Sequence, residues 1–384
     1  MRVRGARGRW VGVTKAVWPE GDAARAAFVE RVRAAGMEHY RELPWRHIDD
    51  VYAVLVSEVM LQQTQVARVE KFWRRFLAAF PTLDALAAAS TSDVLEMWQG
   101  LGYNRRALAL KRTADECAAR FDGELPHAYD DLVALPGIGP ATAAGVRAFA
   151  WEEPGVYLET NVRAVFLHEV FPDRDKVPDR ELVPLVADVC PPAPVRDGAD
   201  AGAGALAGCG MSVGGGAAGE ARRVSRGGVQ AASAANPASA ANPASTASPA
   251  NAASPADPAN PAIHACAPRP TPDPLASPRD WYYALLDYGA YLKAAGENPT
   301  RRSAHYARQS AFEGSRRQKR SWIMRRVLAA DAQAGVPAEV VHAELNAAER
   351  AAGRDGVEAD ECASIVDDLV REGFFKREGA ALAP

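Results

Sequence analysis

The pattern of apolar and polar positions predicts short helices over the first half of the chain. From about residue 22 to residue 190, apolar side chains recur at intervals of three and four, as in Val51, Val54, Leu55 and Val59. The strict alternation that is typical of strands is missing from this region. We therefore expect an all-α domain.

A change of composition interrupts this pattern. Residues 192–277 are dominated by Ala, Pro, Gly, Asn and Ser, and such a segment buries too little apolar surface to offset the entropy lost on ordering. Helical periodicity resumes at residue 278. We therefore predict a disordered insertion at 192–277 within one domain formed by residues 22–191 and 278–318. Such an insertion is tolerable because the entropy of closing a loop grows only logarithmically with its length.

Residues 319–384 predict a small separate module. Three apolar helical segments precede Gly373-Phe374-Phe375, around which we expect a short hairpin, and this is the order of a winged-helix-like module.

Ahead of this module, residues 301–326 contain nine basic residues against the single acid Glu313, the strongest positive patch in the sequence. Contacts with a nucleic-acid backbone are expected from Arg301, Arg302, Arg316 and Arg317.

Composition and charge narrow the class of protein. The 384 residues carry a formal net charge of −3, so a nucleic-acid surface must be a local patch. Five cysteines are scattered without a CxxC pair, which indicates free thiols in a reducing compartment and no cysteine metal site. The basic N-terminus lacks the apolar stretch of a secretion signal, and no run approaches the ~20 apolar residues of a membrane span. We expect a cytoplasmic protein with no membrane partner.

One segment has the composition of a turn that can hold a phosphate. Leu135-Pro136-Gly137-Ile138-Gly139 stands directly before a small-residue helical segment that contains Thr142. Gly137 and Gly139 let the backbone turn tightly and leave amide N–H groups pointing outward at a helix N-terminus, where a phosphate of DNA can be bound without any reading of sequence. An ordinary turn between two helices explains this pentapeptide about equally well.

A single carboxylate, Glu58, stands within an otherwise apolar helical run. Burial of a carboxylate raises its pKa, and a protonated acid in a pocket can donate its proton to a leaving group. The residues alone also allow an exposed Glu58 on an amphipathic helix, or a buried one that is paired with Arg41 or Arg46. The amides that follow, Gln62 and Gln63 among them, can bond base edges or fill a vacated base stack.

Five segments, taken together, resemble the A/G-mismatch adenine DNA glycosylases of the endonuclease III superfamily. They are LPWR at 43–46, SEVMLQQTQV at 57–66, GLGY at 100–103, LPGIG at 135–139 and LETNVRAV at 158–165. The resemblance implies two helical subdomains flanking a cleft, a helix-hairpin-helix motif, and hydrolysis of the N-glycosidic bond of a base flipped out of the duplex. It also implies a monomeric, nucleoid-associated enzyme whose partner is double-stranded DNA containing a mismatch.

The resemblance assigns roles to individual residues. Glu58 stands at the position of the catalytic glutamate that protonates the adenine ring nitrogen, and Gln63 and Tyr103 stand at the positions that wedge into the duplex. The positions that line the adenine pocket are those of Arg41, Trp45 and Arg46. From the residues alone, Tyr103 and Trp45 are almost as well explained as packed aromatic side chains.

The second catalytic position departs from the family pattern. Where relatives have Leu-Asp-x-Asn-Val, this chain has Leu158-Glu159-Thr160-Asn161-Val162. The resemblance implies that Glu159 stabilises the positive charge that develops on the sugar, with one more methylene of reach than the usual aspartate, and that Asn161 orients the water or the sugar.

Three absences qualify the resemblance. The lysine of strand-cleaving relatives is replaced by Ala141, so no lyase activity is expected. No cysteine lies between Cys266 and Cys362, where many relatives hold a [4Fe–4S] cluster, so we expect a clusterless member without a cofactor, in which the arginine-rich stretch replaces the loop of the cluster; the resemblance still implies a monovalent cation at the hairpin. The C-terminal residues are too few for the relatives' 8-oxoguanine-checking module, which resembles nucleotide-pyrophosphate hydrolases.

These observations leave three hypotheses open. The first is a monofunctional glycosylase in base excision repair that removes adenine opposite guanine or 8-oxoguanine. The second keeps the fold and changes the base to mismatched thymine or uracil, or to hypoxanthine. The third is a non-catalytic DNA-binding protein, which would gain nothing from an acid such as Glu58 facing anionic DNA.

Overall fold

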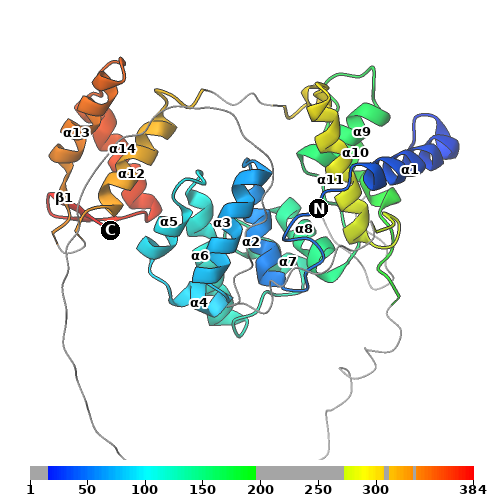
Figure 1. The fold of residues 1–384 in the computed structure, drawn as a ribbon, viewed down its shortest axis with the longest axis horizontal. Coiled ribbons are helices and arrows are strands. Elements are labelled where there is room, and N and C mark those ends of the chain that lie inside the picture. The colour runs from blue at the N-terminus through cyan, green and yellow to red at the C-terminus, as the bar shows by residue number, and fades with distance from the viewer. Residues whose placement is uncertain (1–15, 196–271, 307–310, 332–333) are drawn as a thin grey trace, which may run out of the picture. The chain divides into compact units, whose positions relative to one another are not determined.

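The computed structural model describes residues 16–195, 272–306, 311–331 and 334–384, and in these ranges the chain is mostly helical (Figure 1), as expected. All the elements below belong to one compact unit, which contains every described residue except Val195. Most of the predicted insertion, residues 196–271, lies outside the described residues. None of the described helices is both long enough and apolar enough to cross a membrane.

Two groups of helices form two hydrophobic cores, in agreement with the two expected subdomains. The first group comprises α2 (Val51–Leu61), α3 (Val66–Ala79), α4 (Leu83–Ala88), α5 (Thr91–Trp98), α6 (Arg105–Arg120), α7 (Tyr129–Ala134) and α8 (Pro140–Trp151). The second comprises α1 (Gly21–Glu38), α9 (Thr160–Glu169), α10 (Asp179–Val189), α11 (Pro278–Ala294) and the 3-10 helix η2 (Pro299–Arg302). Helix α11 packs on α1 and α9, so segments from both sides of residues 196–271 share one core.

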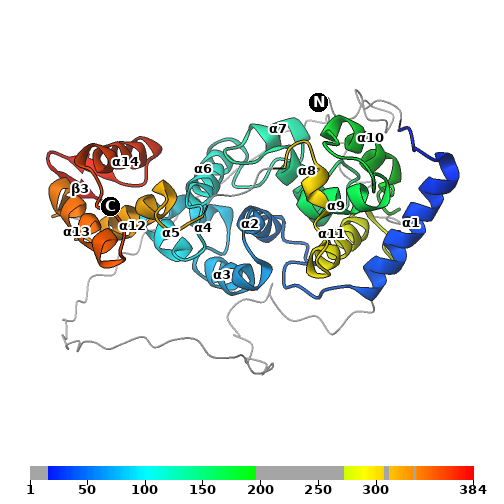
Figure 2. The ribbon, with the colours of Figure 1, turned by 90° about the horizontal axis from the view of Figure 1, so that it is seen from above.

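Helix α2 contributes side chains to both cores. Val54 belongs to the second core and Leu55 to the first, and α8, which packs against α2, is divided in the same way. Figures 1 and 2 both show α2 between α3 and α8. A helix that is covered on every side must be apolar around its whole circumference, which explains the sequence Val51-Tyr-Ala-Val-Leu-Val of its first turns.

The C-terminal module has the three helices and the hairpin that the sequence predicts. It also has a short strand after the first helix, which was not predicted, and its hairpin turns at 379–380, beyond Gly373-Phe374-Phe375. Its elements are α12 (Arg316–Leu328), β1 (Val336–Pro337), α13 (Ala338–Ala351), α14 (Ala359–Glu372), β2 (Lys376–Glu378) and β3 (Ala381–Ala383). The three strands form an antiparallel sheet in the order β1-β3-β2, in which Leu382 pairs with both Val336 and Arg377. The first helix begins three residues before the predicted boundary at 319, because Ser315 caps it by accepting a hydrogen bond from Gln318 N.

The basic stretch 301–326 does not form one positive patch. Arg302, in η2, donates to the carbonyl oxygen of Leu167 in α9, whereas residues 316–326 belong to α12 of the module. Much of the charge of α12 is paired with acids of α14 that follow it by tens of residues. The pairs are Arg316 with Asp368 at 2.6 Å, Lys319 with Glu361 at 2.8 Å and Arg320 with Glu372 at 2.7 Å.

The segment 135–139 forms the turn between α7 and α8, so a helix-hairpin-helix is present. Gly137 has a φ of +75°, which L residues rarely adopt, and a Cβ there would lie 2.5 Å from Cβ of Ala109 in α6. Gly139 precedes α8 with ordinary extended backbone, and a Cβ there would meet nothing within 4 Å. The first glycine of the motif is therefore required by the backbone and by packing, whereas the second is not.

We predict that Gly137→Ala lowers the free energy of unfolding by about 2–4 kcal/mol, because it combines a left-handed backbone with an overlap. Gly139→Ala is the matched control and should cost about 1 kcal/mol or less. Urea denaturation of the two variants measures the difference. Equal losses would show that the turn is not held by its contact with Ala109.

Candidate active site

A cavity of about 140 Å³ lies where α2, α8, α9 and α11 meet. Six residues that the sequence singled out line it together: Arg41, Trp45, Arg46, Glu58, Glu159 and Asn161. They come from the loop before α2, from α2 itself and from the start of α9, which are up to 120 positions apart in the chain. The cavity also exposes Tyr157 and, from α11, Tyr283.

Glu58 is the acid of this cavity. Its helix lies between the two cores, so its carboxyl group has little access to solvent, and this desolvation raises its pKa to about 8. The nearby Glu159 also raises the pKa, while a hydrogen bond with Tyr157 opposes the shift. Space for the carboxyl group comes from Gly145 of α8, where a Cβ would overlap both Oε2 of Glu58 and the ring of Tyr157. The alternative of an exposed Glu58 is therefore wrong.

Glu159 is the N-cap of α9. Its Oε1 accepts hydrogen bonds from the backbone N–H of Val162 at 2.9 Å and from that of Asn161. Burial raises the pKa of Glu159, and these N–H donors together with Lys293 oppose that rise. The extra methylene, relative to aspartate, is thus accommodated by a side chain that folds back onto the positive end of its own helix.

Asn161 is held from a helix that the sequence did not connect with the site. Lys293 of α11 donates from Nζ to Oδ1 of Asn161 at 2.6 Å. Gly289, one turn earlier in α11, lies against Asn161 so closely that a Cβ would overlap its backbone carbonyl. Sequence reasoning missed Lys293 because the two residues are 132 positions apart, and a lysine near a helix end is ordinary.

Arg41 and Arg46 are paired with Asp287 of α11, and not with Glu58. The guanidinium of Arg46 donates to both carboxylate oxygens of Asp287 at 2.7 and 2.8 Å, and Nε of Arg41 donates to Oδ1 at 2.6 Å. Both Arg46 and Asp287 are buried, and the guanidinium lies 4.4 Å from the centre of the Tyr283 ring. The alternative in which an arginine neutralises Glu58 is therefore wrong.

The sequence allows Trp45 to be either a packed core aromatic or a pocket residue, and its position in the structure agrees with both. It is 5% exposed and packs edge-on against Trp73 of the first core, with ring centres 6.0 Å apart. The same side chain lines the cavity. Trp45 is therefore a core aromatic that also forms part of the cavity wall.

The two predicted wedge residues line a second, larger hollow of about 1040 Å³. Gln63 and Tyr103 both have left-handed backbone, with φ of 56° and 51°, which is costly for residues other than glycine. Arg316 and Arg317 of α12 line the same groove, and Arg317 lies over the Tyr103 ring at 5.8 Å. Thr64 borders both this groove and the cavity of Glu58, so the two hollows adjoin.

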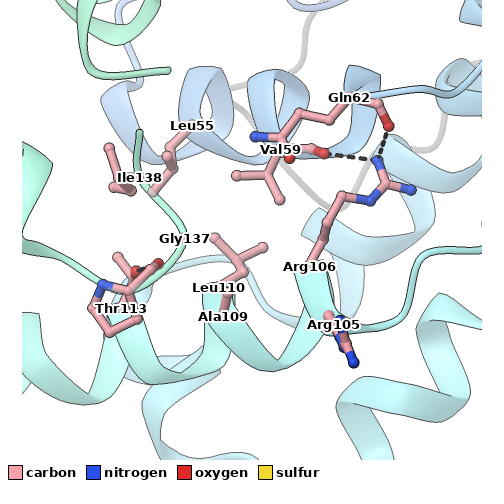
Figure 3. Close-up of a pocket in the computed structure, with 11 residues that line it drawn as sticks. Leu55, Val59, Gln62, Arg105, Arg106, Ala109, Leu110, Thr113, Gly137 and Ile138 are labelled. Carbon is pink, nitrogen blue, oxygen red and sulfur yellow. Dashed lines mark hydrogen bonds between the residues drawn. The ribbon is translucent and has the colours of Figure 1, made fainter. Parts of the chain in front are cut away.

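Arg106 fixes the end of α2 and was not foreseen. Its Nη1 donates to the carbonyl oxygens of Val59, Met60 and Gln62 at 2.8, 2.8 and 2.6 Å, and burial lowers its pKa to about 10. Figure 3 shows it reaching from α6 toward the carbonyls of Val59 and Gln62, beside an apolar cavity of about 240 Å³ that Gly137 and Ile138 of the hairpin also line. The strained turn that carries Gln63 begins directly after this attachment.

The hairpin residues have different surroundings. Thr142 is 7% exposed, and its hydroxyl accepts a hydrogen bond from Nε2 of Gln62 at 3.1 Å. The oxygen of its side chain therefore already accepts a bond within the protein, and its hydroxyl hydrogen and backbone N–H remain as candidate donors to a phosphate. Gly139 is only partly exposed at the N-terminus of α8, where backbone N–H groups favour an anion.

The described residues do not fit an iron–sulfur cluster. Cys117 lies in α6, Cys190 ends α10 and Cys362 lies in α14. Within the described ranges, no group of three or more His, Cys, Asp or Glu residues could hold a metal ion.

Comparison with known proteins finds a family whose model covers Glu58, Glu159 and Asn161. Residues 56–191 match the HhH-GPD superfamily base excision DNA repair protein. The adenine DNA glycosylase of Mycolicibacterium smegmatis is 40% identical over 153 residues, which are 40% of this chain and 52% of that protein. That of Mycobacterium tuberculosis is 42% identical over 132 residues, 34% of this chain and 43% of that protein.

A solved structure, a thermostable thymine-DNA glycosylase, is 23% identical, with a TM-score of 0.40 over 44% of this chain and 80% of that one. The chain spans about half or less of the length of the two curated relatives it matches. The resemblance predicted from the sequence is confirmed over residues 56–191.

We predict that Asp287→Asn lowers the free energy of unfolding by about 3–5 kcal/mol, because it leaves the buried guanidinium of Arg46 without its counter-charge. Asp273→Asn is the matched control. Asp273 pairs with Arg33 at 2.9 Å, but the two side chains are 46% and 39% exposed, so the loss should stay below about 1 kcal/mol. Comparable losses in chemical denaturation would contradict a structural role for the Arg46–Asp287 pair.

A second prediction concerns the pH dependence of stability. The pKa of Glu58 rises from 4.5 in the unfolded chain to about 8 in the folded one, so its contribution is complete below pH 4.5 and is lost as the pH rises to 8. The full loss is roughly 5 kcal/mol. Glu58→Gln should remove this slope from urea denaturation between pH 5 and pH 8. The exposed Glu96→Gln should keep it, and an unchanged slope in Glu58→Gln would refute the burial of an ionisable group there.

Proposed function

We propose that this member of the helix-hairpin-helix glycosylase superfamily is a monofunctional DNA glycosylase of base excision repair that removes adenine mispaired with guanine or 8-oxoguanine. The observation that carries the proposal is the pair of buried carboxyl groups, Glu58 and Glu159, in one cavity. Their surroundings differ, since Glu159 accepts backbone hydrogen bonds from a helix N-terminus and Glu58 does not. Two carboxyl groups held in unlike environments are suited to unlike roles, one acid and one anion.

In the proposed reaction the protonated Glu58 donates its proton to a ring nitrogen of the flipped adenine. The glycosidic bond then breaks, its electron pair leaves with the base, and positive charge develops on the sugar. The carboxylate of Glu159 stabilises that charge. Water adds to the anomeric carbon, and its proton returns to Glu58, which completes the cycle. Because Ala141 supplies no amine, a Schiff base with the sugar at that position is not part of the proposal.

The choice of adenine is supported by the segment 41–64 and by the names of the relatives. Trp45 and the Arg46–Tyr283 stack line the cavity and provide the planar surfaces that a purine requires. Arg46 is committed to Asp287, so it presents a flat face to the base and no free charge.

Double-stranded DNA is the proposed partner of a monomeric enzyme. Removing a base from the stack costs a few kcal/mol, which side chains that enter the vacated space can offset. Gln63 and Tyr103 are proposed for this role, with the hairpin amides at Gly137 and Gly139 and with Arg316 and Arg317 on the backbone. A monovalent cation at the hairpin belongs to the same proposal.

The hypothesis of a non-catalytic DNA-binding protein loses support from the C-terminal module. The second helix of a helix-turn-helix pair is the one that enters the major groove of DNA. Here that helix, α14, has five carboxylates and one arginine. Three of these carboxylates are paired with α12, and α14 offers no excess of positive charge to phosphates, so the proposed DNA binding depends on other surfaces, among them the groove of Gln63 and Tyr103.

We predict that Glu58→Gln reduces single-turnover release of adenine at least 10³-fold, within the range expected for loss of a general acid, with duplex affinity unchanged. For the wild type, the rate should fall about tenfold per pH unit above pH 8, where Glu58 loses its proton. The test uses duplexes with A:G, A:8-oxoguanine, T:G, U:G and hypoxanthine pairs. Release of thymine or uracil alone would replace adenine as the substrate, and release of no base would overturn the proposal.

A further inference from the structure

We propose that Lys293 is a positioning residue that decides which of the two buried carboxyl groups holds the proton, keeping Glu159 ionised and leaving the proton on Glu58. The inference rests on the proposed function and assigns a role to α11, which lies outside residues 56–191, the range that the family model matches. It is carried by the hydrogen bond from Nζ of Lys293 to Oδ1 of Asn161 at 2.6 Å.

The geometry brings the ammonium group to Glu159 through Asn161. The side chain of Lys293 is half-buried, and Asn161 follows Glu159 by two residues in the first turn of α9. The backbone N–H of Asn161 donates to Glu159 while its side-chain oxygen accepts from Lys293. One asparagine therefore connects the cation with the anion, and the close contact of Gly289 fixes the separation of the two helices.

The groups near Glu159 and Glu58 come from α2, α8, α9, α11 and the segment before α9. From α2 comes Glu58, which is like-charged when ionised, and from the segment before α9 comes Tyr157, bonded to Glu58. The N–H groups of α9 and the ammonium of Lys293 favour the ionised form of Glu159. From α11, Tyr283 faces Glu58, and α8 contributes Gly145 at this point.

Two carboxyl groups that share a low-dielectric cavity do not both ionise easily near neutral pH. The position of the surrounding charges decides which one does. A cation beside Glu159 lowers the free energy of the state with Glu159 ionised and Glu58 protonated, relative to the reverse. That state is the one the proposed reaction requires, because only Glu58 is to act as an acid.

The test compares Lys293→Met, which removes the charge, Lys293→Gln, which keeps a donor for Asn161, and Lys293→Arg, which keeps both. Single-turnover adenine release is measured from pH 5 to pH 9. Loss of the charge should move the low-pH limb, where Glu159 becomes protonated, upward by at least one pH unit in Lys293→Met and Lys293→Gln, and Lys293→Arg should restore the wild-type limb. Lys376→Met, on the exposed strand β2, is the matched control and should keep the wild-type profile.

A second readout does not depend on turnover. Affinity is measured for duplexes that carry a cationic pyrrolidine or a neutral tetrahydrofuran in place of the excised nucleoside. The preference for the cation reports an ionised Glu159, and its pH midpoint should rise in Lys293→Met and Lys293→Gln by the same interval as the rate profile. Circular dichroism identifies a variant that fails to fold, in which case Lys293→Gln and Lys293→Arg still decide the outcome.

The outcomes separate the two proposals. Wild-type release of adenine with unchanged pH limbs in Lys293→Met and Lys293→Gln would overturn the role of Lys293 and leave the proposed function standing. A borohydride-trapped adduct that disappears in Lys293→Arg would also overturn it, because the amine would then be a nucleophile. A wild-type protein that releases no base from any duplex would instead overturn the proposed function.

Discussion

The exclusion of water from the space around α2 is the constraint on which the rest of the structure depends. A helix that serves two cores cannot present a polar side to solvent, so every ionisable group beside it needs a partner or a proton. Asp287 is matched by two arginines, Glu159 by the end of a helix, and Glu58 by a proton. These are three different solutions to the same electrostatic problem.

The sequence predicts those parts of the site that lie close together in the chain. Glu58 within an apolar run, and the hairpin turn with Gly137, are local patterns, and the structure has both where the patterns indicate. Pairs of residues that are far apart in the sequence were not predicted. Asp287 contacts Arg46, 241 positions earlier, and no local pattern around Asp287 indicates this partner. The arginine-rich stretch was misleading for the same reason, since the acids that neutralise α12 follow it by 42 to 52 positions.

The winged-helix-like module has the topology of a DNA-binding fold without the basic second helix that such a fold uses to bind DNA. Its topology has the helix-turn-helix arrangement, yet three of the five acids of α14, Glu361, Asp368 and Glu372, pair with basic residues of α12, and α14 has no basic surface. What the module contributes to the groove comes from its first helix, through Arg316 and Arg317 beside Tyr103. The module thus reaches the wedge region by a surface that sequence patterns for this fold would not select.

The site is also divided between two stretches of chain. Residues up to 194 supply Glu58, Glu159 and Asn161, whereas Asp287, Gly289 and Lys293 come from α11, beyond residues 196–271. A chain severed between these stretches would give two fragments, each with one hydrophobic face and part of a charge network, and neither with a working cavity. The proposed excision chemistry therefore depends on the association of these two stretches, because each supplies only part of the cavity and of its charge network.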